Sequence, residues 1–101
     1  MAFNGLRLEY TLDGSLNYIA WKDRMEAVIE DNGLKEFIDR DVPKPRTSDA
    51  ALLDAWQKKI AMMRRILLEG VKDHIVSRLH GKSTPFLMWK DLTDLFQSRS
   101  D

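Results

Sequence analysis

The distribution of apolar side chains predicts helices along most of the chain. These side chains recur at spacings of three and four residues, which places them along one face of an α-helix. The first predicted helix runs from Asn17 to Gly33, and its apolar positions are Tyr18, Trp21, Met25, Val28 and Ile29. A second helix of about two turns is predicted around Leu34, Phe37 and Ile38, before a loop with two prolines at residues 42–47.

Three further helices are predicted after this loop. The longest has its apolar positions at Leu53, Trp56, Ile60, Met63 and Leu67, and it is expected to end at Glu69-Gly70. The next has Val71, Ile75 and Leu79 and reaches about His80. The last has Met88, Trp89, Leu92, Leu95 and Phe96. The pattern therefore predicts an all-α fold, a compact bundle of four to five short helices.

Four residues have the chemistry of helix caps. Asn17 is predicted to be an N-cap whose side-chain carbonyl accepts a backbone N–H of the first turn. Gly33 is predicted to end the first helix, because glycine takes the left-handed conformation without a steric penalty. Thr84 followed by Pro85 predicts the start of the last helix, since proline at the first helical position sacrifices no intrahelical hydrogen bond.

The two ends of the chain lack the helical pattern. Leu6, Leu8, Tyr10 and Leu12 alternate with other residues, which predicts an extended segment. Because no second strand is predicted to pair with it, we expect residues 1–16 to form an extended arm that lays Tyr10 or Leu12 on the helices. Residues 17–97 are then the helical domain, and the polar residues 98–101 are expected to form a frayed tail.

The apolar faces are expected to build one core. Trp21, Trp56 and Trp89 fall on three different predicted helices, and we interpret them as meeting at a common centre. A soft binding groove that includes Met62-Met63 is the alternative. The expected core signature consists of Tyr18, Trp21, Met25, Trp56, Ile60, Leu67, Trp89, Leu92 and Phe96.

Composition narrows the classes of function. The chain has 101 residues, 44% of them hydrophobic, which is enough apolar surface for one folded domain. It contains no cysteine, which excludes disulfides, thiolate zinc sites and cysteine nucleophiles. No apolar run approaches the roughly 18–20 residues of a membrane-spanning helix, and the first residues lack the features of a secretory signal. We therefore expect an intracellular protein that does not use a membrane as a partner.

The sequence also lacks the patterns of catalytic sites. His74 and His80 are six residues apart, so one helix face cannot hold both, and no H-E-x-x-H pattern surrounds them. None of the serines lies in a G-x-S-x-G context, and no glycine-rich phosphate loop is present. We predict a protein that is not an enzyme and that uses no cofactor, metal or small-molecule substrate.

The charges argue against a domain that mainly binds nucleic acid. Sixteen basic residues balance sixteen acidic ones, whereas such domains usually carry a basic excess that neutralises phosphates. One cluster on the longest predicted helix still provides an RNA-contact hypothesis, and it consists of Lys58, Lys59, Arg64 and Arg65. The alternative interpretation is a solvated helix face that makes ion pairs.

The order and spacing of these residues resemble the N-terminal capsid domain of copia-type retrotransposon Gag proteins. The segment LDGSLNYIAW, from Leu12 to Trp21, is similar to the L-x-G-x-N-Y-x-x-W opening of that family, with Leu16 as an additional residue. The segment TPFLMWKDL, from Thr84 to Leu92, is similar to its T-A-x-x-x-W-x-x-L element, with Pro85 in place of the usual alanine. Between and after these segments the similarity covers Met25, Gly33-Leu34, Phe37-Ile38, Trp56, Ala61, Ile66, Leu67 and Phe96, while Lys35 stands where an aromatic residue is frequent.

This resemblance implies a structural domain of capsid type. Gag domains of this kind self-associate into the shell of a virus-like particle around element RNA, in the cytoplasm. RNA would be bound through other parts of the full protein, because no zinc knuckle is present in these residues. The chain is then expected to be a fragment, or a short domesticated relative, for which a nuclear location is also compatible.

The resemblance leaves two interpretations of the surface. For self-association, the mixed charges on the polar face of the first predicted helix are the expected contacts: Lys22, Asp23, Glu26 and Glu30. Individually weak contacts suit a shell because multiplicity supplies the strength. The alternative is a domesticated interaction module that binds a partner peptide near residues 42–47 and Phe86-Leu87.

Overall fold

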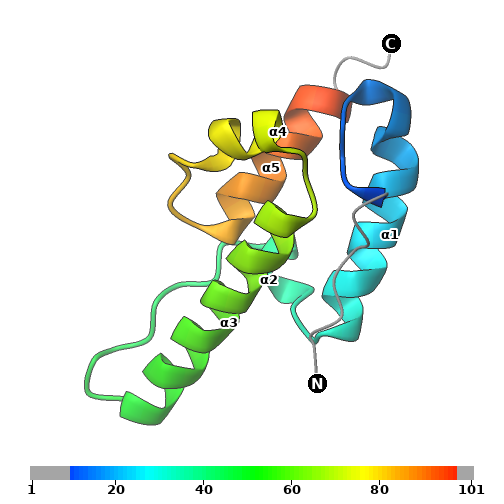
Figure 1. Cartoon of the computed structure of the whole chain (residues 1–101). Helices are drawn as coiled ribbons and strands as arrows, with labels where there is room; N and C mark the ends of the chain where they lie inside the picture. Colours follow the sequence, from blue (N-terminus) through cyan, green and yellow to red (C-terminus); the bar gives the residue numbers. More distant parts are fainter. Residues whose placement is uncertain (1–9, 98–101) are drawn as a thin grey trace.

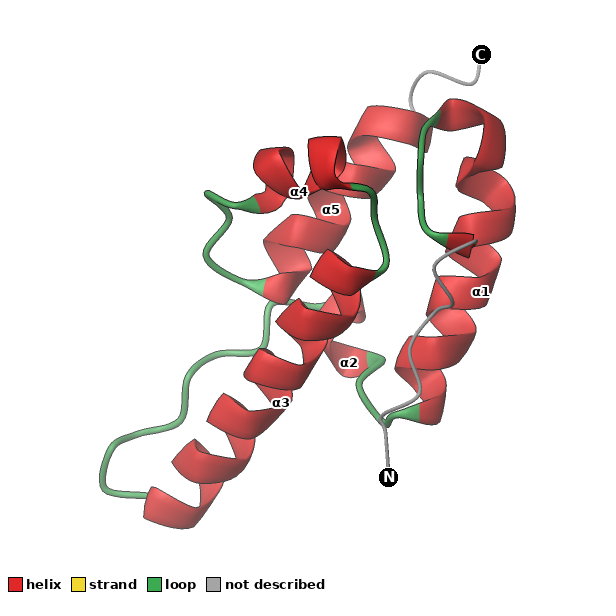
Figure 2. Ribbon diagram, in the orientation of Figure 1, coloured by secondary structure: helices red, strands yellow, loops and turns green. Residues whose placement is uncertain are grey.

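The computed structural model describes residues 10–97 and confirms the all-α fold. Residues 1–9 and 98–101 lie outside the described part, and with them Leu6, Leu8 and the predicted tail. Helices joined by loops make up the whole described range, without a strand (Figure 2). The elements are the 3-10 turn η2 Ser15–Asn17 and the α-helices α1 Tyr18–Asp31, α2 Glu36–Asp39, α3 Ala50–Glu69, α4 Asp73–Leu79 and α5 Pro85–Gln97.

The helices form a bundle from which one half of α3 projects. Helix α5 packs against α2 and α3, and η2 packs against α1. Figure 1 shows α1 on one side of the molecule and the first half of α3 running beyond the bundle on the other. The projecting half makes the molecule elongated, with extents of 46 × 31 × 21 Å.

Two tryptophans form the centre of the core. The rings of Trp21 and Trp89 stack with their centroids 5.6 Å apart and their planes inclined by 29°. Tyr18 extends this aromatic cluster by stacking on Phe96 at 5.5 Å, although Phe96 is only partly buried. The predicted core residues that are buried are Tyr18, Trp21, Met25, Leu67, Trp89 and Leu92.

Trp56 does not reach this centre, so the interpretation of three tryptophans meeting at one point was wrong. Trp56 and Ile60 are only partly buried. Trp56 belongs to the first half of α3, which projects beyond the other helices. The Trp56 indole N–H donates to the carbonyl of Val42 at 3.4 Å. The indole therefore lies against the loop at residues 42–47, and it lines one hollow together with Phe37 of α2.

Leu12 attaches the N-terminal segment to the bundle. Its N–H donates to the carbonyl of Gly70 at 2.9 Å, and its carbonyl accepts the N–H of Lys72 at 2.9 Å. These bonds form an isolated parallel bridge to Val71, and the Leu12 side chain is fully buried. The extended segment therefore pairs with the link between α3 and α4, which the sequence pattern did not identify as a partner.

Asn17 precedes α1, but its side chain does not cap that helix as predicted. Its Oδ1 accepts the backbone N–H groups of Asp13 at 3.0 Å and Gly14 at 3.3 Å, and its Nδ2 donates to the carbonyl of Thr11 at 2.9 Å. The prediction was wrong because η2 continues directly into α1, so the amide turns back toward the preceding loop. The residue instead fixes the path by which the chain enters α1.

Gly33 ends α1 with a φ of 72°, in the left-handed region. Its N–H donates to the carbonyl of Glu30 at 3.0 Å, and the N–H of Leu34 donates to Ile29 at 3.0 Å. These are the two hydrogen bonds of a Schellman motif, in which the flanking side chains, here Leu34 and Ile29, are buried. Helix α2 has one turn rather than two, because Leu34 belongs to this motif and Arg40 has an extended backbone.

The start of α5 has the geometry of a capped helix. Thr84 Oγ1 accepts the backbone N–H of Leu87 at 3.2 Å, and Pro85 is the first helical residue. Pro85 is also buried, so its ring contributes to packing as well as to initiation.

We expect Gly33→Ala to destabilise the fold by about 1–2 kcal/mol, because an L-residue in the left-handed region is strained. No atom lies within 4 Å of an added Cβ at this position, so the cost comes from the backbone alone. Urea unfolding followed by circular dichroism measures the change. Gly81→Ala is the matched control, since Gly81 has equally open space and no positive φ. Equal effects of the two substitutions would contradict this role of Gly33.

Candidate interaction surfaces

The buried polar groups of the described residues make structural hydrogen bonds. Thr11 is the one buried polar side chain between residues 10 and 97. The Trp21 indole N–H donates to the carbonyl of Gly70 at 2.7 Å. Within the same range, no buried side-chain nitrogen or oxygen lacks a hydrogen-bond partner, and no three His, Asp or Glu residues are grouped to hold a metal ion.

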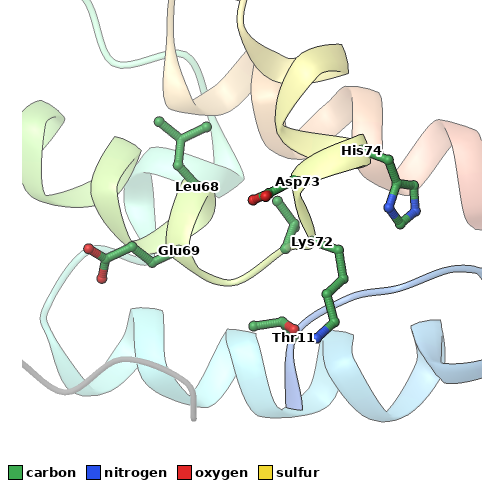
Figure 3. A pocket seen from close by; sticks show the side chains of 7 residues that line it. Thr11, Leu68, Glu69, Lys72, Asp73 and His74 are labelled. Carbon is green, nitrogen blue, oxygen red and sulfur yellow. The ribbon is translucent and has the colours of Figure 1, made fainter. Parts of the chain in front are cut away.

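A hollow lies where the α3–α4 link meets the N-terminal segment. It has a volume of about 760 Å³ and is open to solvent. Figure 3 shows Glu69 and His74 at opposite sides of it, with Lys72 and Asp73 between them. The His74 Nε2–H donates to the backbone carbonyl of Asp13 at 2.9 Å. These side chains do not converge on one point where a substrate could react, so we interpret the hollow as a joint between segments.

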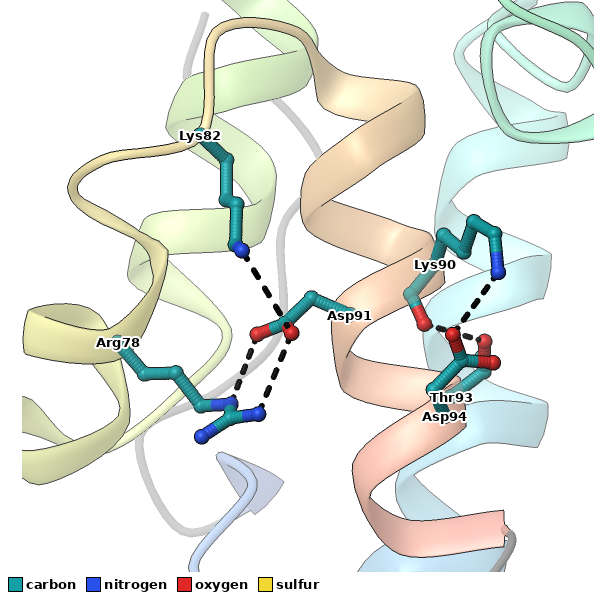
Figure 4. Close-up of polar contacts among 6 residues, drawn as sticks. All are labelled: Arg78, Lys82, Lys90, Asp91, Thr93 and Asp94. Carbon is teal, nitrogen blue, oxygen red and sulfur yellow. Dashed lines mark hydrogen bonds and ion pairs between the residues drawn. The ribbon is translucent and has the colours of Figure 1, made fainter.

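An ion-pair network fixes α4 and the loop after it on α5 (Figure 4). The Arg78 guanidinium donates from Nε to Asp91 Oδ2 at 2.8 Å and from Nη2 to Oδ1 at 3.3 Å. Lys82 Nζ lies 3.8 Å from the same carboxylate. The Asp91 side chain is only 16% exposed, so this forked pair is shielded from solvent better than the ion pair between Lys90 and Asp94 on the same helix.

Among the described residues, two groups have a shifted pKa, and each shift follows from the surroundings of the group. Burial raises the pKa of the Tyr18 hydroxyl, and the negative charge of Glu26 raises it further. The Tyr18 hydroxyl contacts Gln97 Oε1 at 3.1 Å. The hydrogen bond to Asp39 raises the pKa of Lys35, as does the nearby charge of that carboxylate. Both shifts stabilise the ordinary protonated state of the group, so neither prepares a general acid or base for neutral pH.

The four residues of the RNA-contact hypothesis do not form one basic surface. Arg64 points into the molecule, where its Nη1 donates to the carbonyl of Lys82 at 3.1 Å and contacts Met88 Sδ at 3.6 Å. Lys58 pairs with Asp54 at 3.1 Å, and Arg65 pairs with Glu69 at 3.1 Å. Lys59 lies on another side of α3, where it lines a separate hollow.

The predicted self-association residues on α1 also lie on two different sides of the helix. Lys22 pairs with Glu26 at 3.2 Å, and both are partly buried near the core side of the helix. Asp23 and Glu30 are exposed on the outward side. Sequence reasoning missed two apolar neighbours of that side, Leu16, which is fully exposed, and Ile19, which is 65% exposed. The outward face of α1, as we call it below, consists of Leu16, Ile19, Ala20, Asp23, Ala27 and Glu30.

A small hollow lies between the first half of α3 and the preceding loop. Its apolar part includes Pro45, Leu52 and Trp56, and the charged side chains Glu36 and Lys59 border it. Leu52 is 57% exposed, so this part of α3 presents apolar surface to solvent. The arm surface, as we call it below, consists of this hollow together with the exposed loop residues Lys44 and Arg46.

The zero net charge conceals two oppositely charged segments. Residues 23–41, which include most of α1 and all of α2, contain seven acidic and three basic side chains, a net charge of −4. Residues 44–65, which include the projecting half of α3, contain six basic and two acidic side chains, a net charge of +4. This separation is visible in the sequence once charges are counted segment by segment.

No helix between residues 10 and 97 is both long and apolar enough to cross a bilayer. No protein-family model, curated protein or solved structure matches the chain. A function is therefore inferred from the surfaces themselves and from the resemblance of the sequence.

We expect Arg64→Ala to destabilise the fold by about 1–2 kcal/mol, because it removes a charge-assisted hydrogen bond to Lys82 and a packing contact. Lys58→Ala should change stability by less than about 0.5 kcal/mol, since it removes only an exposed ion pair on one helix. Thermal or urea unfolding of both variants checks the difference. An Arg64→Ala variant as stable as the wild type would contradict this structural role of Arg64.

Proposed function

We propose that this chain is a structural, capsid-type domain that self-associates to build the shell of a retrotransposon virus-like particle around element RNA. The resemblance to copia-type Gag proteins supports this proposal, and an all-α bundle is the architecture that the resemblance implies. The observation that carries it is the exposure of large apolar side chains. The three most exposed among the described residues lie at two places: Leu16 and Ile19 beside and on α1, and Leu52 on α3.

Exposed apolar side chains favour contacts with other protein surfaces. Burying one such side chain contributes about 1.5–3 kcal/mol, so two small patches would give a weak contact after the cost of association. Weak contacts suit a shell, because misplaced copies can dissociate while many correct contacts together hold the particle. RNA would be bound by other parts of a full Gag protein. Three of the four basic residues considered above already form hydrogen bonds or ion pairs within this chain.

A partner-peptide module is the second candidate function, and the hollow beside Trp56 favours it. Pro45, Leu52 and Trp56 could receive one apolar side chain of an extended peptide. The other predicted peptide contact, Leu87, is 38% exposed and lies at the start of α5, outside this hollow. This candidate predicts a single saturable partner without self-association.

We expect the chain to associate reversibly with itself in sedimentation-velocity experiments over a range of concentrations. The weight-average mass should rise above the 11.8 kDa of the monomer as concentration increases. The double substitution Leu16→Ser and Ile19→Ser should weaken association at least about tenfold, because it removes apolar area that association would bury. It should leave the fold intact, since both side chains are exposed.

Leu87→Ser is the matched control for this experiment, because Leu87 is an exposed leucine outside the two apolar places. It should leave the association constant unchanged. A wild-type chain that stays monomeric at every concentration and salt level would contradict a self-associating function and favour the partner-peptide module.

A further inference from the structure

We propose that the outward face of α1 in one copy docks on the arm surface of α3 in a second copy, guided by opposite charges. This inference rests on the proposed self-association and identifies the two surfaces that would carry it. Each surface combines exposed apolar side chains with charge, acidic on α1 and basic on the arm.

The outward face of α1 is opposite to the face that fills the core. Tyr18, Trp21, Met25 and Ile29 are buried, and at about 100° per residue positions 20, 23, 27 and 30 fall on the far side of α1. Leu16 is exposed in η2, directly before the helix. This face contains Leu16, Ile19 and two alanines, so a helix or loop of another copy can approach closely. It combines exposed apolar side chains with two carboxylates, whereas solvent-exposed helix faces are usually polar throughout.

The charge of this face is acidic because the neighbouring bases are directed elsewhere. The Arg24 guanidinium lies 4.2 Å from the centroid of the Tyr10 ring. Lys22 pairs with Glu26 on the flank of the helix. Asp23 and Glu30 remain exposed, and among residues 10–97 no ion pair engages either of them.

The arm surface has the complementary chemistry. Leu52 and Trp56 supply an apolar floor, and the exposed bases Lys44, Arg46 and Lys59 lie along its length and on the adjoining loop. Within the described range none of these three bases forms an ion pair. The one carboxylate beside the hollow, Glu36, pairs with Arg40 at 3.3 Å. The hollow and the adjoining loop together therefore carry more basic than acidic side chains, which suits an apolar and acidic occupant.

A second copy of this chain fits that description better than a partner of unknown chemistry. The segment net charges of −4 and +4 are equal and opposite. Helix α1, which contains the proposed acidic face, lies on the other side of the molecule from the projecting half of α3 (Figure 1). Each copy has one surface of each kind. Copies can therefore pair twice around a two-fold axis or once in an open chain, according to the angle between the surfaces. In either case salt should weaken the contact, because these charges are exposed to solvent.

The test exchanges charges between the two surfaces. The face variant carries Asp23→Lys and Glu30→Lys, and the arm variant carries Lys44→Glu and Lys59→Glu. Each variant alone should associate at least about tenfold more weakly than the wild type in sedimentation velocity, because like charges then meet. An equimolar mixture should recover association to within about threefold of the wild type, because the reversed charges match again.

The control variant carries Lys72→Glu and Lys90→Glu, which change the net charge by as much as the arm variant but at other exposed positions. It should associate like the wild type, because both proposed surfaces are intact. Association as weak as that of the arm variant would mean that overall charge alone drives association, which overturns the pairing. Circular dichroism checks that each variant folds. A variant that does not fold is replaced by its neutral form, which is Asp23→Asn with Glu30→Gln for the face and Lys44→Gln with Lys59→Gln for the arm. The neutral forms should weaken association in the same direction but by less.

The outcomes separate this pairing from the proposed function. If the wild type associates and both charge variants associate equally well, the pairing is wrong but self-association remains supported. A wild type that never associates would overturn both. If the arm variant associates normally but loses binding to a single-stranded oligo-uridine RNA, the basic arm is a nucleic-acid surface and the pairing is wrong.

Discussion

The carbonyl group of Gly70 is the point on which the arrangement of the chain depends. It accepts two hydrogen bonds, one from the Trp21 indole at 2.7 Å and one from the Leu12 N–H at 2.9 Å. Three segments far apart in sequence meet there: the N-terminal segment, α1 and the end of α3. Trp21 also stacks on Trp89, so the same side chain connects α1 to the end of α3 through its hydrogen bond and to α5 through its ring. The orientation of α1 then determines which of its faces points to solvent.

Much of the fold could be predicted because helix formation leaves a local periodic signal. All five helices follow from the spacing of apolar residues, and Gly33 and Thr84 mark two of their boundaries. The features that were missed depend on residues distant in sequence. Periodicity cannot tell that the half of α3 that carries Trp56 projects beyond its neighbours, or that Asn17 turns toward the preceding loop. For the same reason, the pairing of Leu12 with the α3–α4 link could not be foreseen.

The interaction surfaces were harder to predict than the fold. A helical wheel assigns Arg64 to a solvated face, but a long side chain can reach a neighbouring loop, and here it contacts the carbonyl of Lys82. Total composition hid the opposite charges of residues 23–41 and 44–65, because they cancel. Leu16 and Ile19 were not predicted as contact residues. The prediction rested on the buried apolar stripe of α1, and the opposite face was assumed to be polar. The buried interior fixes the positions of the helices, and the remaining outer faces are free to contact other copies.

The buried side chains form a closed core that holds the helices together. Hydrogen exchange of the tryptophan indole N–H groups tests this most directly. The Trp21 indole N–H is buried against Gly70, whereas that of Trp56 is partly buried and donates over 3.4 Å to a loop carbonyl. We predict that the Trp21 indole exchanges only through global unfolding, with a free energy of opening equal to the free energy of unfolding, while Trp56 exchanges through local opening. Exchange of Trp21 as fast as that of Trp56 would contradict a closed, structural core.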